Sequence, residues 1–192
     1  MALHGFSEVS FQMIADELGI SQSTVLHHFP NKLLLIRSVL AQVIDSNHQH
    51  VSGMIQLKDS ALNRLWKHLE GNRQWAQENP EQASVVLLIY YMGSVNPEFS
   101  AIYRTMLSRG RERVFELVLA AQREKSILPT LPAELLAETI HDILLASLLN
   151  VSATRSARTE TRRLHAKWKS VLESLLVPQG GAQWLKAGGG VP

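Results

Sequence analysis

The 192-residue sequence contains no cysteine, which excludes disulfides, thiol nucleophiles and thiolate metal ligands. It also lacks a long apolar run. The strongest, from Val85 to Met92, is far shorter than the ~20 residues that a membrane-spanning helix needs. No basic segment followed by an apolar stretch opens the chain, so we expect no signal peptide. The sequence therefore predicts a cytoplasmic protein with no membrane partner.

Catalytic and metal-binding motifs are also missing. No nucleophile elbow, phosphate-binding glycine loop or dinucleotide fingerprint is present, so nothing supports an enzyme or a catalytic residue. Histidines pair at His27 and His28 and at His48 and His50, but neither pair has the i, i+4 spacing that places two ligands on one helical face. We therefore predict no metal site and no cofactor.

Positive charge is scarce in the first fifty residues. The net charge of the chain is +2, yet residues 1–50 contain only Lys32 and Arg37 as firm cations. Attraction to phosphate supplies most nonspecific affinity for DNA. The charge pattern of this region alone therefore counts against nucleic-acid binding.

Apolar residues recur at helical spacing along most of the chain, and no stretch alternates as a strand would. Hydrophobic residues make up 45% and charged residues 19%, which is typical of a globular protein with a real core. We predict an all-α fold, with a buried helix over 80–93 that is apolar on most sides. The predicted helices span residues 11–18, 22–28, 31–53, 59–79, 80–93, 96–125, 133–151 and 159–177.

The first two predicted helices are short and joined by a glycine. Ser10 is a candidate N-cap of the first helix, Gly19 ends it, and Ser21 is placed to cap the second. Asn31 offers the next cap, after Pro30. This spacing indicates a helix-turn-helix, although an ordinary helical hairpin has the same pattern. The expected core positions are Ile14, Ala15, Leu18, Ile20, Val25 and Phe29.

Gln22, Ser23 and Thr24 open the second helix. In a helix-turn-helix this position meets base edges, where glutamine can pair with adenine and a threonine methyl can touch thymine. The elements of this region resemble, in order and spacing, the DNA-binding domain of the tetracycline-repressor (TetR) family. The resemblance rests on Gly5-Phe6, Ile14-Ala15, Gly19-Ile20-Ser21, Ser23-Thr24-Val25 and His28-Phe29-Pro30-Asn31-Lys32.

The resemblance implies a three-helix DNA-binding domain over residues 1–45 and a helical ligand-binding and dimerisation bundle over 46–178. Residues 179–192, rich in glycine, are predicted to form a disordered tail. Carried over by position, Gln22, Ser23, Thr24 and His27 would read bases or nearby backbone. Ser10, His28 and Lys32 would contact phosphate. Ser10 has the alternative role of a cap alone, and His27 that of a solvent-exposed residue.

Two features depart from the family pattern. The family usually has tyrosine where this chain has Leu26, and a leucine cannot bond a phosphate. The family also has a complete first helix before the Gly-Phe pair, whereas only Met1 to His4 precede Gly5 here. We therefore expect a truncated first helix, which a misplaced start or a trimmed chain would explain.

Aromatic, methionine and histidine side chains in the second region suit a mostly apolar ligand site. The same residues at helical spacing also suit a plain core, and a histidine such as His141 needs a polar partner if it is buried. The predicted ligand-binding residues are Trp66, Tyr90, Met92, Tyr103, Met106 and His141.

Two apolar stripes near the end of the chain predict a four-helix dimer interface, which also resembles the family's dimer. The alternative is that both helices pack only within one subunit. The predicted interface residues are Leu136, Ile140, Ile143 and Ser147 on one helix and Leu164, Trp168, Val171, Leu172 and Leu175 on the next.

From the resemblance we expect a ligand-responsive transcriptional repressor. It would bind palindromic operator DNA as a homodimer and be released by a small-molecule effector. The alternative is a small-molecule binding or sequestering protein of the same fold whose DNA binding is weak or lost. The few cations of residues 1–50 and the leucine at position 26 favour that alternative.

Overall fold

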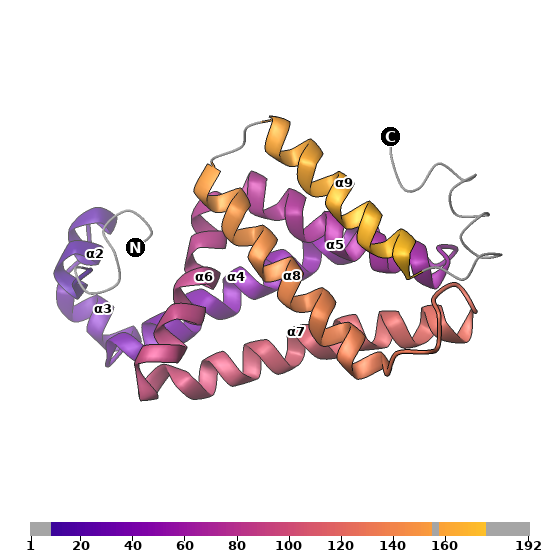
Figure 1. Cartoon of the computed structure of the whole chain (residues 1–192). Helices are drawn as coiled ribbons and strands as arrows, with labels where there is room; N and C mark the ends of the chain where they lie inside the picture. The colour runs from indigo at the N-terminus through magenta and orange to yellow at the C-terminus, as the bar shows by residue number, and fades with distance from the viewer. Residues whose placement is uncertain (1–8, 155–157, 176–192) are drawn as a thin grey trace. The chain divides into compact units, whose positions relative to one another are not determined.

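The structure is a computed structural model that describes residues 9–154 and 158–175, and every regular element in these residues is a helix (Figure 1). None of these helices combines the length and the hydropathy of a membrane span. The elements are α2 (Phe11–Leu18), α3 (Gln22–His28), α4 (Lys32–Met54), α5 (Ala61–Glu78), α6 (Pro80–Val95), α7 (Pro97–Arg123), α8 (Ala133–Thr154) and α9 (Arg158–Ser174).

The chain divides into two compact units. Unit 1 comprises residues 1–46 and 81–104, and unit 2 comprises residues 47–80 and 105–192. Helices α4 and α7 each contribute residues to both units. The division predicted from the sequence, at residues 45 and 46, stays a prediction, and the predicted tail 179–192 lies outside the described residues.

The helix starts show the predicted caps. The Ser10 and Ser21 hydroxyl oxygens accept hydrogen bonds from the backbone N–H groups of Met13 and Thr24, at 3.1 Å each. Asn31 Oδ1 accepts from the Leu34 N–H at 2.9 Å. Each bond satisfies a backbone donor that the first turn of a helix leaves without a partner, which contributes about 1 kcal/mol. The predicted caps at Ser10, Ser21 and Asn31 are confirmed.

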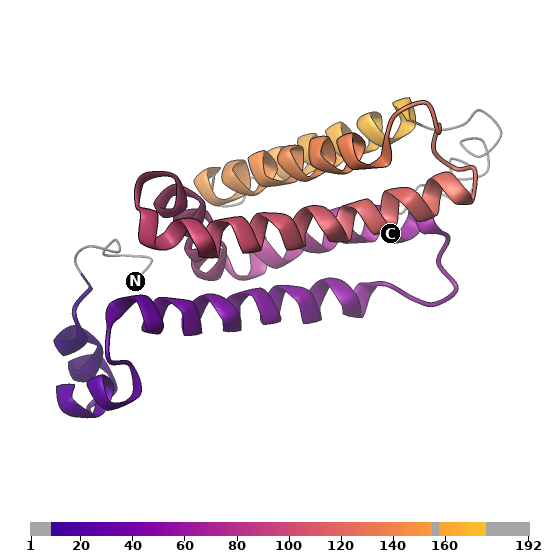
Figure 2. The same cartoon turned by 90° about the horizontal axis from the view of Figure 1, so that it is seen from below.

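The core of unit 2 is built on α5. Leu62, Leu65, Trp66 and Leu69 recur at steps of three and one on this helix, and all four are buried. Helix α5 packs against α8, and α8 packs against α9 (Figures 1 and 2). Burying one leucine side chain stabilises the fold by about 1.5–3 kcal/mol. The apolar stripe of α5 is therefore a main source of the stability of this unit.

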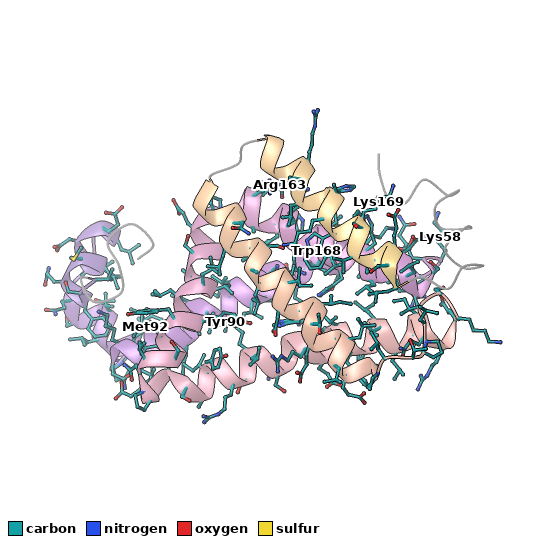
Figure 3. The ribbon with its side chains drawn as sticks, viewed as in Figure 1. Lys58, Tyr90, Met92, Arg163, Trp168 and Lys169 are labelled. Atoms are coloured by element: carbon teal, nitrogen blue, oxygen red, sulfur yellow. The ribbon has the colours of Figure 1, made fainter. Side chains whose placement is uncertain are left out.

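Six of the predicted interface residues are already buried within one chain. Ile140 and Leu172 are 0% exposed within one chain, and Trp168, labelled on α9 in Figure 3, is 2% exposed. A side chain that is already buried loses no surface when a second chain docks. Such residues belong to the core of the subunit, and their role in a dimer interface stays a prediction. The residues concerned are Leu136, Ile140, Ser147, Leu164, Trp168 and Leu172.

Three burial expectations are wrong. On α6 only Ala83 and Ile89 are buried, and Tyr91 is exposed, although the helix is apolar on most sides. A helix that is apolar all round gives no periodic signal to indicate which side is covered. Leu18 and Ile20, expected in the core of the helix-turn-helix, are exposed because no side chain in the described part of the chain covers them.

Helix α7 ends in a strained residue. Lys125 has φ 57°, in the left-handed region. The Lys125 and Ser126 N–H groups donate to the carbonyls of Gln122 and Ala121, at 2.9 Å each. Glycine is the usual residue at this position of a helix end, because a Cβ there meets backbone atoms.

We predict that Lys125→Gly raises the free energy of unfolding by about 0.5–1 kcal/mol, because relief of strain exceeds the added freedom of the unfolded chain. Urea denaturation of the full chain measures it. Lys125→Ala, which keeps the Cβ, is the control and should show no gain. Equal stabilisation by both variants would contradict the account.

Candidate nucleic-acid interface and effector site

The turn between α2 and α3 is fixed by the backbone of Gly19. Its φ of 64° and ψ of 31° lie in the left-handed region, which glycine adopts without a steric penalty. The Gly19 N–H donates to the Asp16 carbonyl at 3.3 Å, and the Ile20 N–H donates to the Ala15 carbonyl at 3.0 Å. These bonds close the end of α2 and direct the chain into α3.

The first turn of α3 presents small polar side chains to solvent. Gln22, Ser23 and Thr24 are all exposed, whereas Val25 is buried and holds the helix against α2. The Ser21 hydroxyl lies 2.8 Å from the hydroxyls of both Ser23 and Thr24. The side chains at the start of α3 are therefore ordered by the cap itself, in a form that suits contact with base edges.

The other predicted DNA-contact residues lie at the ends of neighbouring helices. Ser10 caps α2, and Lys32 opens α4 and is half-buried. His27 and His28 end α3, both exposed, with ring centroids 5.5 Å apart in an edge-to-face arrangement. The structure thus places all seven predicted residues in unit 1, on or beside the helix-turn-helix, and their contacts with DNA stay a prediction.

The predicted ligand-binding residues divide between the units. Tyr90 and Tyr103 meet in unit 1, with ring centroids 5.5 Å apart and an interplanar angle of 84°, and Met92 lies on the same helix as Tyr90 (Figure 3). Trp66, Met106 and His141 belong to unit 2. Trp66 is buried in the core, with its ring edge-to-face against His165 at 4.8 Å. These observations leave the ligand role of the six residues as a prediction.

Unit 2 also contains a buried polar pair that the sequence analysis missed. His68 and Asn72 lie one turn apart on α5, and both are buried. The Asn72 amide donates to the His68 carbonyl at 2.7 Å, and Asn47 Nδ2 donates to Asn72 Oδ1 at 3.1 Å. Burial, together with the charges of Arg113 and His141, lowers the pKa of His68 to about 4. His68 is therefore neutral at physiological pH.

The polar neighbours of His68 in the sequence explain why its burial was not predicted. It lies on α5 beside Lys67 and before Glu70, so the local pattern is that of a solvated face. Its burial results from the packing of α5 against α8, which a single sequence does not reveal. The one available signal was the i, i+4 spacing of His68 and Asn72, which allows a hydrogen bond along the helix.

Comparison with known families agrees with this geometry. Residues 1–39 match the model of the bacterial regulatory proteins of the tetR family. The match covers the helix-turn-helix and the start of α4. The helix-turn-helix segment is therefore similar to that of the bacterial regulatory proteins of the tetR family. No curated protein sequence matches the chain.

Solved structures of transcriptional regulators share the fold of the chain. One is a TetR transcription regulator from Haloarcula marismortui, with 19% identity, a TM-score of 0.73 and 92% of each chain covered. Another is a regulator from Saccharomonospora viridis in complex with choline, with 21% identity, a TM-score of 0.72 and coverage of 86% of this chain and 87% of that one. At these identities the likeness establishes the all-α fold, as the resemblance predicted.

The buried His68 makes the stability of this protein depend on pH. Its pKa is about 4 in the folded chain and 6.5 in an unfolded one, so the unfolded state binds more protons between these values. The stabilisation is complete above pH 6.5 and is lost as the pH falls toward 4. The expected loss is at most about 3 kcal/mol.

We predict that His68→Leu flattens this decline, as measured by urea denaturation at several pH values from 7 to 4.5. His27→Leu, at an exposed histidine of unit 1, is the matched control and should leave the decline in place. If the free energy of unfolding of His68→Leu falls with pH as steeply as that of the unchanged chain, His68 is not the buried base described here.

Proposed function

We propose that this protein is a TetR-family transcriptional repressor that binds palindromic operator DNA as a homodimer and is released by a small-molecule effector. The observation that carries the proposal is the exposed first turn of α3, held by the Gly19 turn and the Ser21 cap inside the segment that matches the family. In this proposal α3 enters the major groove, and Gln22, Ser23, Thr24 and His27 contact bases or nearby backbone.

Phosphate contacts in the proposed complex come from few cations. Lys32 would contact phosphate through its charge, and Ser10 and His28 would contribute hydrogen bonds. Leu26 is exposed on α3 but has no hydrogen-bonding group, so it adds none. With so few charges neutralised, we expect a shallow dependence of DNA affinity on salt.

The effector would act by shifting a population between two arrangements of the dimer. Only an arrangement with its recognition helices about one DNA turn apart, roughly 34–36 Å, fits successive major grooves. A ligand that binds another arrangement more tightly lowers the affinity for DNA by the same coupling free energy. Helix α4 is the proposed lever, because residues 32–46 belong to unit 1 and residues 47–54 to unit 2.

The proposed dimer uses the exposed sides of α8 and α9. Leu135 and Leu149 are 60% and 54% exposed and lie about four helical turns apart on α8, which places them on one face. Ala146 is exposed on the same face and allows close approach. Large exposed leucines at this spacing are typical of a surface that a second chain covers.

We predict that Leu149→Glu raises the dimer dissociation constant at least tenfold, because it places a charge in an apolar interface. Light scattering across a concentration series of the full chain measures this. Leu57→Glu, at a residue that is 98% exposed in unit 2, is the control and should leave the mass unchanged. A dimer unaffected by Leu149→Glu would mean that this face of α8 is not the interface.

We predict that the chain selects a palindromic sequence from genomic fragments at low salt, and that Thr24→Ala relaxes this selection. A contact to a base is worth about 1–3 kcal/mol, so Thr24→Ala should lose roughly tenfold or more in operator affinity. His28→Ala removes a proposed phosphate contact and should weaken binding to all sequences alike. Gln42→Ala, exposed on α4 in unit 1, is the control and should select the same sequence.

A second function is favoured by the few cations of residues 1–50 and by Leu26. This is a small-molecule binding or sequestering protein of the same fold with weak or lost DNA binding. The selection experiment separates the two, because such a protein enriches no sequence while it still binds its ligand. Failure of selection at low salt would replace the repressor with this function.

A further inference from the structure

A group of polar side chains lies within unit 2, among helices that are otherwise packed by apolar residues. His68 and Asn72 come from α5, and His141 comes from α8, which packs against α5. All three side chains are buried, and His141 is only 5% exposed. The charges of His141 and Arg113 both reach His68. His68, Asn72 and His141 are therefore buried polar groups on two packed helices, and Arg113 on α7 is close enough for its charge to act on His68. We call these four residues the cluster.

Helix α7 brings Gly110 and Arg113 to this cluster. A Cβ at Gly110 would lie 2.3 Å from His141 Nε2, so the imidazole occupies the position where any larger residue would place its side chain. Arg113 follows one turn later on the same face of α7. Because Gly110 carries no side chain, His141 approaches α7 on the face where Arg113 also lies, one turn further along.

Arg113 differs from Arg73 and Arg111 in its ion pairing. Arg73 pairs with Glu70, with Nε 2.9 Å from Oε2, and Arg111 pairs with Glu138 at 3.2 Å and Asp142 at 3.3 Å. Within residues 9–154 and 158–175, Arg113 joins no ion pair. Burial lowers its pKa, and the like charge of Arg109 lowers it further, with no carboxylate acting in the opposite direction.

His141 adds an unsatisfied polar atom. Its Nδ1 is buried and makes no hydrogen bond, since the nearest carboxylate oxygen, Asp142 Oδ1, lies 3.9 Å away. A buried polar atom without a partner costs about 1–3 kcal/mol. Burial lowers the pKa of His141, so its neutral form, with one N–H donor and one acceptor nitrogen, is favoured.

We propose that unit 2 binds a small organic acid, with the carboxylate held by Arg113 and by the imidazoles of His68 and His141. A guanidinium presents two parallel N–H groups that match a carboxylate, and each imidazole can donate one further hydrogen bond. The apolar residues of α5 around the cluster suit the hydrocarbon part of such a ligand. This inference rests on the proposed function, because it names the chemical class of the effector.

The charges of the cluster exclude two other ligand classes. No group of three or more histidine, aspartate or glutamate side chains in the described residues is arranged to hold a metal ion. We also expect this chain to bind a ligand of opposite charge to that in the Saccharomonospora viridis regulator, which was solved in complex with the cation choline. A cation beside Arg113 would meet a like charge, and Asp142, the carboxylate 3.9 Å from His141, already pairs with Arg111.

The test uses the full chain with benzoate and octanoate at up to 10 mM, beside benzamide, octanamide and choline. Calorimetry and thermal unfolding measure binding without DNA. We expect at least one carboxylate to bind and to raise the melting temperature, and the matching amide and choline to bind at least tenfold more weakly. Arg113→Gln should weaken carboxylate binding by about tenfold to a hundredfold.

Two further variants keep the test decisive. Arg113→Lys keeps the charge without the planar fork, so it should retain more affinity than Arg113→Gln. Arg123→Gln, exposed near the end of the same helix, is the matched control and should bind as the unchanged chain does. Binding of no carboxylate, equal binding of an amide, or unchanged binding by Arg113→Gln would each overturn the proposal.

Operator binding is measured separately, so the two proposals fail independently. A chain that selects operator DNA but binds no carboxylate remains a regulator with an effector of another class. Conversely, a chain that binds carboxylates through Arg113 but selects no DNA supports the ligand site and overturns the repressor.

Discussion

The left-handed turn at Gly19 is the constraint on which the proposed DNA-reading surface depends. It ends α2 after only eight residues, and the Ser21 cap then starts α3 within two residues. Such a short connection leaves the second helix little freedom, and the two helices pack together, with Ala15 of α2 and Val25 of α3 both buried. The exposed polar turn of α3 is thus presented by backbone geometry rather than by a large core.

Unit 2 is organised differently, because its helices bury polar groups as well as apolar ones. Leucines and tryptophans on α5, α8 and α9 stabilise the unit, yet His68, His141 and Asn72 lie within the same interior. Burying such groups opposes folding unless each finds a partner. A functional site is where a fold is expected to accept this cost, and the unpaired charge of Arg113 at the same place indicates the sign of the ligand.

The helices and the helix-turn-helix could be predicted from the sequence, because caps, glycine and proline act locally. Ser10, Gly19, Ser21 and Asn31 all behave as expected. Burial was harder to predict, since it depends on which elements pack together. The apolar stripes of α8 and α9 were assigned to a dimer, whereas α5 covers much of α8 within one chain. His68 was missed for the same reason, and of the buried cluster only His141 was anticipated.

The central claim is that two copies of α3 are held at the spacing of successive major grooves. Because the chain has no cysteine, Glu17→Cys, exposed on α2, accepts one spin label per subunit without further change. Pulsed dipolar spectroscopy on the selected operator should give one main inter-label distance, consistent with recognition helices about 34–36 Å apart. Absence of dipolar coupling on operator-bound protein would contradict the dimeric repressor.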